Sequence, residues 1–338
     1  MEVIYGPQNL TMKARTSAAL LALLLFAPMT QAVTLLEADS LWLFDGGTVG
    51  TNATYTQVID SSANAHAVSS SNFNNLSWVT VPSTGPYGGT AQSSDGHGLQ
   101  FTPVVTVSNA GAANADTVSA ATLQSINASI SGSSTMITRM RWDGAISGLD
   151  DNTNQWIVSN GFGGWSEPDL ASKGYMFGLT TSGGLYYYTA AANTGIGQTA
   201  SGASHTFTPT GLTLTVGEWY DIAMVLNDFD DGVKTTGQVT FYVVGSDGQL
   251  QTFTSNATTW VSPTSNTTLQ LGGESAGTGT SNQRKSFNGA MDYLAMYDTA
   301  LSQEEVASIF AAPEPSRGLL LLGGVMLVCF RRRRSSAV

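Results

Sequence analysis

The first segment of this sequence that could do chemistry is the serine motif Gly273-Glu274-Ser275-Ala276-Gly277. It has the G-x-S-x-G spacing of an esterase nucleophile elbow, which requires a helix after the serine and a histidine later in the chain. The segment 278–286 is polar, and the three histidines, at positions 66, 97 and 205, all precede the serine. We therefore interpret the motif as a glycine-rich loop and predict no catalytic residue in it.

The second such segment is the acidic run Asn227-Asp228-Phe229-Asp230-Asp231-Gly232, whose oxygen ligands would suit Ca²⁺. The EF-hand spacing fails, because the glycine stands one place early and the twelfth position, counted from Asp228, is Val239 rather than a bidentate glutamate. We expect a solvated hairpin tip between two strands.

Composition excludes other classes of site. Of the 338 residues 11% are charged, and the single cysteine, Cys329, leaves the folded part without an internal disulfide, a thiolate nucleophile or a cysteine metal site. Between residues 33 and 312, six Lys and Arg stand against twenty-two Asp and Glu, a formal charge of −16. Because nucleic acid is bound by basic surfaces, we expect no nucleic-acid partner, whereas cations such as Ca²⁺ are compatible with this charge.

The N-terminal region has the three parts of a secretory signal peptide. Met12-Lys13-Ala14-Arg15 is basic, the run AALLALLLFAP is apolar, and Met29-Thr30-Gln31-Ala32 ends on a small residue. We predict a signal peptide over residues 1–32, cleaved after Ala32. Residues 1–11 do not fit this pattern, so Met12 is the expected initiator; the alternative is a signal with a longer polar lead.

The C-terminal region, 313–338, contains three elements in a fixed order. Pro313, Glu314 and Pro315 come first, then the apolar run 318–330, and then the basic cluster, which consists of Arg331, Arg332, Arg333 and Arg334. An arginine cluster of this kind stays on the cytoplasmic side of a membrane, and a run of about 13 apolar residues is marginal for spanning it. The alternative is an ordinary C-terminal anchor.

This order resembles the PEP-CTERM sorting signal of Gram-negative bacteria. In that family an exosortase, a membrane-embedded cysteine protease, is thought to process the tail of proteins destined for the cell surface or the exopolysaccharide matrix. The resemblance implies that Pro313, Glu314 and Pro315 are recognised by such a protease. It also implies that the tail holds the chain in the inner membrane before processing. Arg317 departs from the small polar residue usual at that place in the family.

The middle of the chain, residues 33–312, consists of short alternating segments that favour β-strands. In the segment 135–142, Met136 and Met140 face one way, whereas Arg139 and Arg141 face the other. Further strands are expected at 41–44, 155–160, 174–180, 185–190, 219–227, 238–245, 250–254, 267–273 and 291–297. Small polar residues dominate 104–134, which we interpret as an inserted loop or a weak edge. A capping box predicts one short helix after Ser302, with Glu305 in the third helical position.

Three stretches of the middle region resemble the laminin-G/concanavalin A-like superfamily. They are Val58-Ile59-Asp60-Ser61-Ser62-Ala63-Asn64, Gly217-Glu218-Trp219-Tyr220-Asp221-Ile222-Ala223 and the ending from Phe287 to Val306. The resemblance implies an all-β fold, a two-sheet antiparallel jelly-roll sandwich with one short C-terminal helix between the signal and the sorting helix. The E-x-D-x-x-E triplet that carries catalysis in the β-glucan hydrolases of this superfamily is missing, so we expect no glycosidase of that lineage.

The resemblance also implies candidate binding residues. Many laminin-G-like domains bind one Ca²⁺ ion beside the ligand surface, and Asp60, Asn64 and Asp292 are the expected ligands here. The alternative is that Asp60 and Asp292 cap turns or hold loop amides.

Aromatic side chains are the second kind of candidate. Trp165, Tyr186 and Tyr188 could stack on sugar rings, the alternative being core or edge packing. The expected function is non-catalytic binding of an extracellular polysaccharide or surface glycan by an exported cell-surface or matrix protein. The alternatives are a purely structural matrix component and, from another class, a glycan hydrolase or lyase.

Overall fold

The computed structural model describes residues 33–54, 56–66, 68–72, 75–89, 96–106, 117–119, 122–126, 133–146, 155–160, 175–189, 208–227, 233–255, 258–261, 268–272 and 286–312. Contacts divide the chain into Met1–Val33 and Thr34–Val338, and the described elements all belong to the second unit. The predicted signal peptide (1–32) and sorting tail (313–338), as well as the serine motif (273–277), lie outside the described residues. Among those residues no helix has the length and apolar character needed to cross a bilayer.

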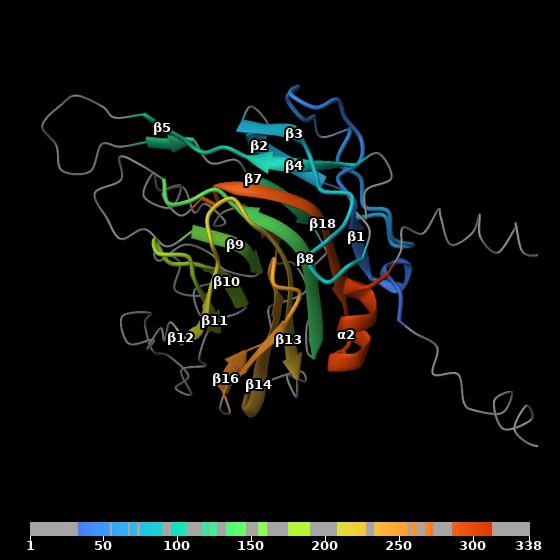
Figure 1. The fold of residues 1–338 in the computed structure, drawn as a ribbon, viewed down its shortest axis with the longest axis vertical. Helices are drawn as coiled ribbons and strands as arrows, with labels where there is room; N and C mark the ends of the chain where they lie inside the picture. The colour runs from blue at the N-terminus through green and yellow to red at the C-terminus, as the bar shows by residue number, and fades with distance from the viewer. Residues whose placement is uncertain are drawn as a thin grey trace, which may run out of the picture. The chain divides into compact units, whose positions relative to one another are not determined.

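Most of the described strands form two stacked antiparallel sheets (Figure 1). The nine-stranded sheet has the order β15 (Leu250–Thr254), β14 (Val233–Val244), β13 (Trp219–Asn227), β8 (Ser134–Trp142), β18 (Gly289–Tyr297), β4 (His97–Phe101) and β3 (Leu76–Thr80), with β1 (Ser40–Trp42) paired to β18 and β16 (Thr258–Val261) paired to β14. The seven-stranded sheet has the order β12 (Thr208–Thr213), β11 (Gly184–Thr189), β10 (Tyr175–Leu179), β9 (Gln155–Asn160), β17 (Thr268–Leu271), β7 (Thr122–Ile126) and β2 (Val68–Asn72).

This arrangement is consistent with the expected jelly-roll sandwich. The strands predicted at 155–160, 219–227 and 250–254 have the same bounds in the structure as β9, β13 and β15. They were identifiable because alternate apolar residues fill one face of each sheet. Turns also form where glycine was expected, since Gly183 and Gly248 adopt φ values of 81° and 67° between paired strands.

The interpretation of 104–134 as an inserted loop or weak edge is wrong for part of this segment. β7 is an inner strand that pairs with both β17 and β2. Only β5 (Val104–Thr106) and β6 (Thr117–Ser119) form a separate two-stranded sheet. Backbone hydrogen bonds decide membership of a sheet, so a strand within a segment poor in large apolar residues can occupy an inner position.

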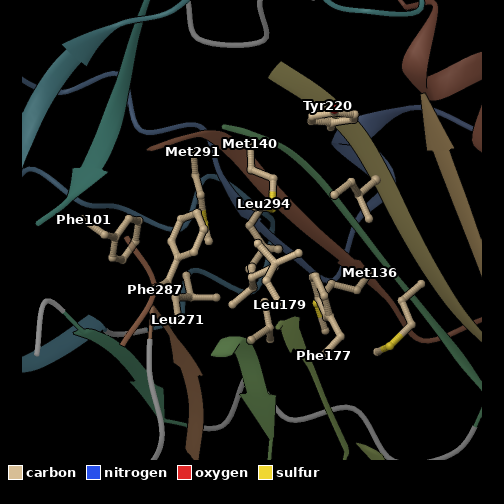
Figure 2. Close-up of a cluster of buried hydrophobic side chains, with 14 of the residues drawn as sticks. Phe101, Met136, Met140, Phe177, Leu179, Tyr220, Leu271, Phe287, Met291 and Leu294 are labelled. Carbon is tan, nitrogen blue, oxygen red and sulfur yellow. The ribbon is translucent and has the colours of Figure 1, made fainter. Parts of the chain in front are cut away.

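The hydrophobic core lies between the two sheets (Figure 2). Met136 and Met140 of β8, which were predicted to share one face, contribute to it from the nine-stranded sheet, and Phe177 and Leu179 of β10 contribute from the other sheet. The rings of Phe177 and Phe241 meet edge to face with centroids 6.0 Å apart. Because β8 alternates, its Arg139 and Arg141 lie on the outer face of the nine-stranded sheet.

The outer face of the nine-stranded sheet is partly covered by the predicted helix, α2 (Gln303–Phe310). Its N-cap is Ser302, whose hydroxyl accepts a hydrogen bond from the Glu305 amide, and the Glu305 side chain accepts one from the Ser302 amide. This confirms the capping box. Val306, Ile309 and Phe310 are the buried residues of α2. A short 3₁₀ helix, η1 (Leu35–Glu37), precedes β1 and buries Leu35.

Candidate functional site

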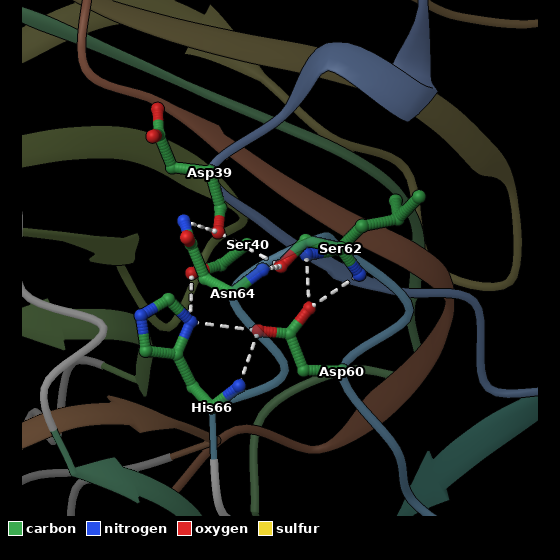
Figure 3. Close-up of polar contacts among 7 residues, drawn as sticks. Asp39, Ser40, Asp60, Ser62, Asn64 and His66 are labelled. Atoms are coloured by element: carbon green, nitrogen blue, oxygen red, sulfur yellow. Dashed lines mark hydrogen bonds and ion pairs between the residues drawn. The ribbon is translucent and has the colours of Figure 1, made fainter.

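Asp60, the first expected Ca²⁺ ligand, holds a loop together through hydrogen bonds (Figure 3). Its Oδ1 accepts from the amides of Leu41 and Ser62 at 2.8 and 2.9 Å. Its Oδ2 accepts from the amide of His66 at 3.0 Å and lies 2.7 Å from His66 Nδ1. Burial alone would raise the pKa of Asp60, but the three backbone amides outweigh it and the pKa lies below its usual value.

The residues present do not fit a Ca²⁺ site at Asp60. Calcium takes six to eight oxygen ligands, and both Asp60 oxygens already accept N–H donors. Asn64 donates its amide to the Asp39 carbonyl at 2.9 Å instead of turning an oxygen toward Asp60. Among the residues that the structure describes, no group of three or more His, Cys, Asp or Glu side chains could hold a metal ion. The alternative, that Asp60 holds loop amides, is confirmed.

The same loop brings a serine, a histidine and an aspartate together, but their geometry is not that of a catalytic triad. Ser40 Oγ lies 2.9 Å from His66 Nδ1, which is the nitrogen that Asp60 also contacts. In a hydrolase triad the nucleophile and the carboxylate bind opposite nitrogens of the imidazole ring. Ser40 therefore has no base at the position that proton abstraction requires.

Asp292, the third expected Ca²⁺ ligand, belongs to a buried ionic cluster on the outer face of the nine-stranded sheet. It is the extra residue of a β-bulge, because Met291 pairs with Met140 and Tyr293 with Arg139. The Asp292 carboxylate lies against Arg139, with Nη1 and Oδ2 3.4 Å apart. Asp292 is fully buried, so its structural role is to balance a buried cation.

Arg139 is the centre of this cluster. Its Nε lies 2.7 Å from Asp221 Oδ1, and its guanidinium carbon lies 6.0 Å from the centroid of the Tyr293 ring. Burial opposes the charge, but attraction to Asp221 outweighs it and raises the pKa of Arg139. Burial also raises the pKa of Tyr293 well above its usual value. The cluster is closed by the segment containing Gly85, where a Cβ would collide with the Arg139 guanidinium.

Of the three aromatic candidates, Tyr186 alone has a side chain that the structure describes. Tyr186 on β11 is only 2% exposed, so the expectation of an open ring is wrong for this residue. It lies between Leu185 and Tyr187, both of which are also buried. Trp165 and the side chain of Tyr188 lie outside the described residues.

A different set of residues forms a polar row across the outer face of the nine-stranded sheet. Ala290 of β18 pairs with Gln100 of β4 on one side and with Arg141 of β8 on the other. Arg141 in turn pairs with Trp219 of β13. The four strands are neighbours in the sheet (Figure 1), so the row is about 14 Å long at the usual strand spacing. We call Gln100, Arg141, Asp143 and Trp219 the Arg141 ledge.

The polar members of the Arg141 ledge form a closed ring of hydrogen bonds. Arg141 Nε donates to Asp143 Oδ1 at 2.6 Å, and Nη2 donates to Asp143 Oδ2 and to Gln100 Oε1 at 2.9 Å each. The ring closes through Gln100 Nε2, which donates to Asp143 Oδ2 at 2.8 Å. The side chains of Arg141 and Asp143 are 22% and 25% exposed, so solvent and ligands can reach them.

Neighbouring residues fix the ledge and extend it with apolar surface. Asp143 is held by its amide, which donates to the Asn288 carbonyl at 3.0 Å. The Arg141 guanidinium carbon lies 5.6 Å from the centroid of the half-buried Trp219 ring. Val216 is 55% exposed. It lies beside Gly144, the residue after Asp143, because a Cβ added to Gly144 would be 3.7 Å from both Val216 methyl groups. Fixed polar groups beside apolar surface are what a small-molecule site requires.

Sequence reasoning did not identify the Arg141 ledge. The available signal was the placement of Arg139 and Arg141 two residues apart on one strand, in a middle region with six basic residues. Nothing local distinguishes the two arginines. Their different burial depends on the Gly85 segment, which is remote in sequence.

The comparison of the sequence with known families bears on this fold. Residues 145–307 match the model of the concanavalin A-like lectin/glucanases superfamily, a laminin-G type. The concanavalin A-like match includes Trp219 and Asp292 but begins after Asp143. No curated protein matches the chain by sequence.

Several solved structures match parts of this chain at low sequence identity. The receptor-binding domain of botulinum neurotoxin type G is 9% identical with a TM-score of 0.47, and the match covers 81% of this chain and 51% of the toxin domain. This chain thus spans about half of that domain. Domain 4 of an extracellular arabinanase from Geobacillus stearothermophilus, in complex with arabinotriose, is 12% identical with a TM-score of 0.41. The match covers 81% of this chain and 98% of the arabinanase domain. A sialidase CBM40 from Ruminococcus gnavus, bound to α2,3-sialyllactose, is 14% identical with a TM-score of 0.37. The match covers 54% of this chain and 84% of the CBM40 chain.

Proposed function

We propose that this sandwich is a non-catalytic carbohydrate-binding domain that holds its ligand on the Arg141 ledge. The observation that carries the proposal is the closed ring of Arg141, Asp143 and Gln100 beside the half-buried Trp219. Sugar hydroxyls both donate and accept hydrogen bonds, and the ring offers guanidinium donors and carboxylate acceptors at fixed positions. The apolar faces of a sugar match the indole and Val216.

We further propose that the domain works outside the cytoplasm. The support is the sequence of the two ends: a basic, apolar and small-residue start over 1–32, and Pro313-Glu314-Pro315 with its apolar run and arginine cluster. An exosortase-type protease would then be the partner of the tail, and the membrane its attachment before processing. Expression of the full chain with an epitope placed between residues 82 and 84 would test export. Protection of the epitope from protease in cells whose outer membrane has been permeabilised would contradict it.

Trp219→Ala should weaken glycan binding by about thirtyfold, the effect of removing an aromatic contact worth about 2 kcal/mol. The measurement is the affinity of the full chain for immobilised glycans, compared with that of the variant. Ile59→Ala is the control, because Ile59 is 64% exposed and lies outside the ledge. If no glycan binds the full chain, a purely structural matrix role replaces this proposal.

A further inference from the structure

We infer that the Arg141 ledge selects uncharged polyhydroxy ligands, that is, neutral sugar residues, and discriminates against carboxylated, sulfated or phosphorylated ones. This inference rests on the proposed function and adds the ligand class. The inference follows from two observations: which N–H groups of Arg141 already donate hydrogen bonds, and which charges surround Arg141.

The hydrogen bonds of Arg141 leave no forked edge for an anion. A guanidinium binds a carboxylate through two parallel N–H donors on one edge. The edge made by Nε and Nη2 is taken by Asp143, at 2.6 and 2.9 Å. The second N–H of Nη2 is taken by Gln100, so the edge shared by Nη1 and Nη2 is blocked as well. The donors left over are those of Nη1, which suit single acceptors such as hydroxyl oxygens.

The charge around the ledge also opposes an anion. Asp143 balances the charge of Arg141 directly, and the other cation on the same strand, Arg139, is balanced by two buried carboxylates, Asp221 and Asp292. The two cations therefore face three carboxylates, and a carboxylated sugar would meet net repulsion across the low-dielectric sheet surface.

The remaining contact surface is apolar. Trp219 and Val216 bring an indole and two methyl groups to the end of the row. Ala290 pairs with both Gln100 and Arg141 and lies beneath the hydrogen bond between their side chains. A neutral sugar needs no compensating cation, and it can place C–H groups on the indole while its hydroxyls reach Nη1 and Asp143. This combination fits a neutral saccharide better than an ionic one.

The test is a titration of the full chain with two sets of probes. The neutral probes are cellohexaose, laminarihexaose and xylohexaose, and the carboxylated probes are oligogalacturonate and oligoalginate of similar length. We expect a neutral probe to bind, with an affinity that changes little between low and high salt, and we expect the carboxylated probes not to bind.

Asp143→Asn is the decisive variant. It removes the carboxylate that occupies the Nε and Nη2 edge of Arg141. The affinity for the neutral probe should therefore fall about tenfold, and measurable binding of oligogalacturonate should appear. Asp247→Asn is the matched control, because it removes the same charge from an exposed turn between β14 and β15. It should change the affinity for neither probe.

Other outcomes would contradict the ligand class, the position of the site or the proposed function. Binding of carboxylated probes to the unaltered chain would overturn the ligand class but uphold carbohydrate binding. Binding of a neutral probe that is unaffected by Asp143→Asn would show that the ledge is not the site. Binding of no saccharide would overturn the proposed function itself.

Discussion

Arg139→Met should lower the free energy of unfolding by about 3–5 kcal/mol, the usual effect of removing one partner from a buried ion pair. Arg139, Asp221 and Asp292 are all fully buried on the outer face of the nine-stranded sheet. Without the guanidinium, two buried carboxylates would lose their ion-pair partner, while Asp221 would keep the hydrogen bond that its Oδ2 accepts from the Tyr87 amide at 3.2 Å. Urea unfolding of the variant and the unaltered protein measures the effect.

Two companion variants separate the ionic contribution from a general loss of side-chain volume. Arg141→Met, on the same strand and face, should cost about 1 kcal/mol or less because its ion pair is partly exposed. Arg139→Met combined with Asp221→Leu and Asp292→Leu should recover much of the loss, since an apolar cluster of similar volume can replace a buried ionic one. Equal effects of the two single arginine variants would contradict this explanation.

Asp60→Asn should be the next most damaging change, with a loss of about 3 kcal/mol at neutral pH. An asparagine offers one acceptor oxygen where the carboxylate uses two, so it would place an amide nitrogen against backbone N–H groups. The 60–66 loop would lose either its attachment to β1 through Leu41 or its contact with His66 (Figure 3).

The effect of Asp60→Asn should depend on pH in a defined direction. The pKa of Asp60 is lower in the folded protein than in the unfolded chain, where it is about 3.9. Its stabilising contribution is therefore complete above that unfolded value and is lost as the pH falls through the folded pKa. The stability difference between the unaltered protein and the variant should be full at pH 7 and smaller at pH 3.

Asp298→Asn is the control for this pH dependence. Burial and the nearby Asp39 carboxylate raise the pKa of Asp298, so amidation there should leave stability unchanged or slightly increase it at pH 7. Urea midpoints for both variants at the two pH values provide the comparison. A pH-independent loss for Asp60→Asn would contradict the role of the ionised carboxylate.

Much of the sandwich could be predicted because its signals are local. The alternation in β8 separated the face of Met136 and Met140 from that of both arginines, and the capping box at Ser302 located α2. β7 was missed since its place in the sheet depends on pairing with β17 and β2, which the composition of its own segment does not encode.

The candidate site was harder to predict because it depends on contacts between distant segments. Asp292 was predicted as a cation ligand, but it lies at a one-residue bulge and pairs with the buried Arg139. Arg141 meets Gln100 from a strand about 40 positions earlier and Trp219 from one much later in the chain. Long-range register decides all of these contacts, whereas sequence patterns report on neighbours.

The most direct measurement of the central claim is the indole N–H spectrum of the full chain during titration with the neutral oligosaccharide that binds. The protein has seven tryptophans, and a Trp219→Phe variant would identify the Trp219 signal. We predict that this signal shifts in proportion to bound sugar while those of the buried Trp42 and Trp78 stay in place. Saturation by the sugar with an unmoved Trp219 signal would show that the ligand lies elsewhere.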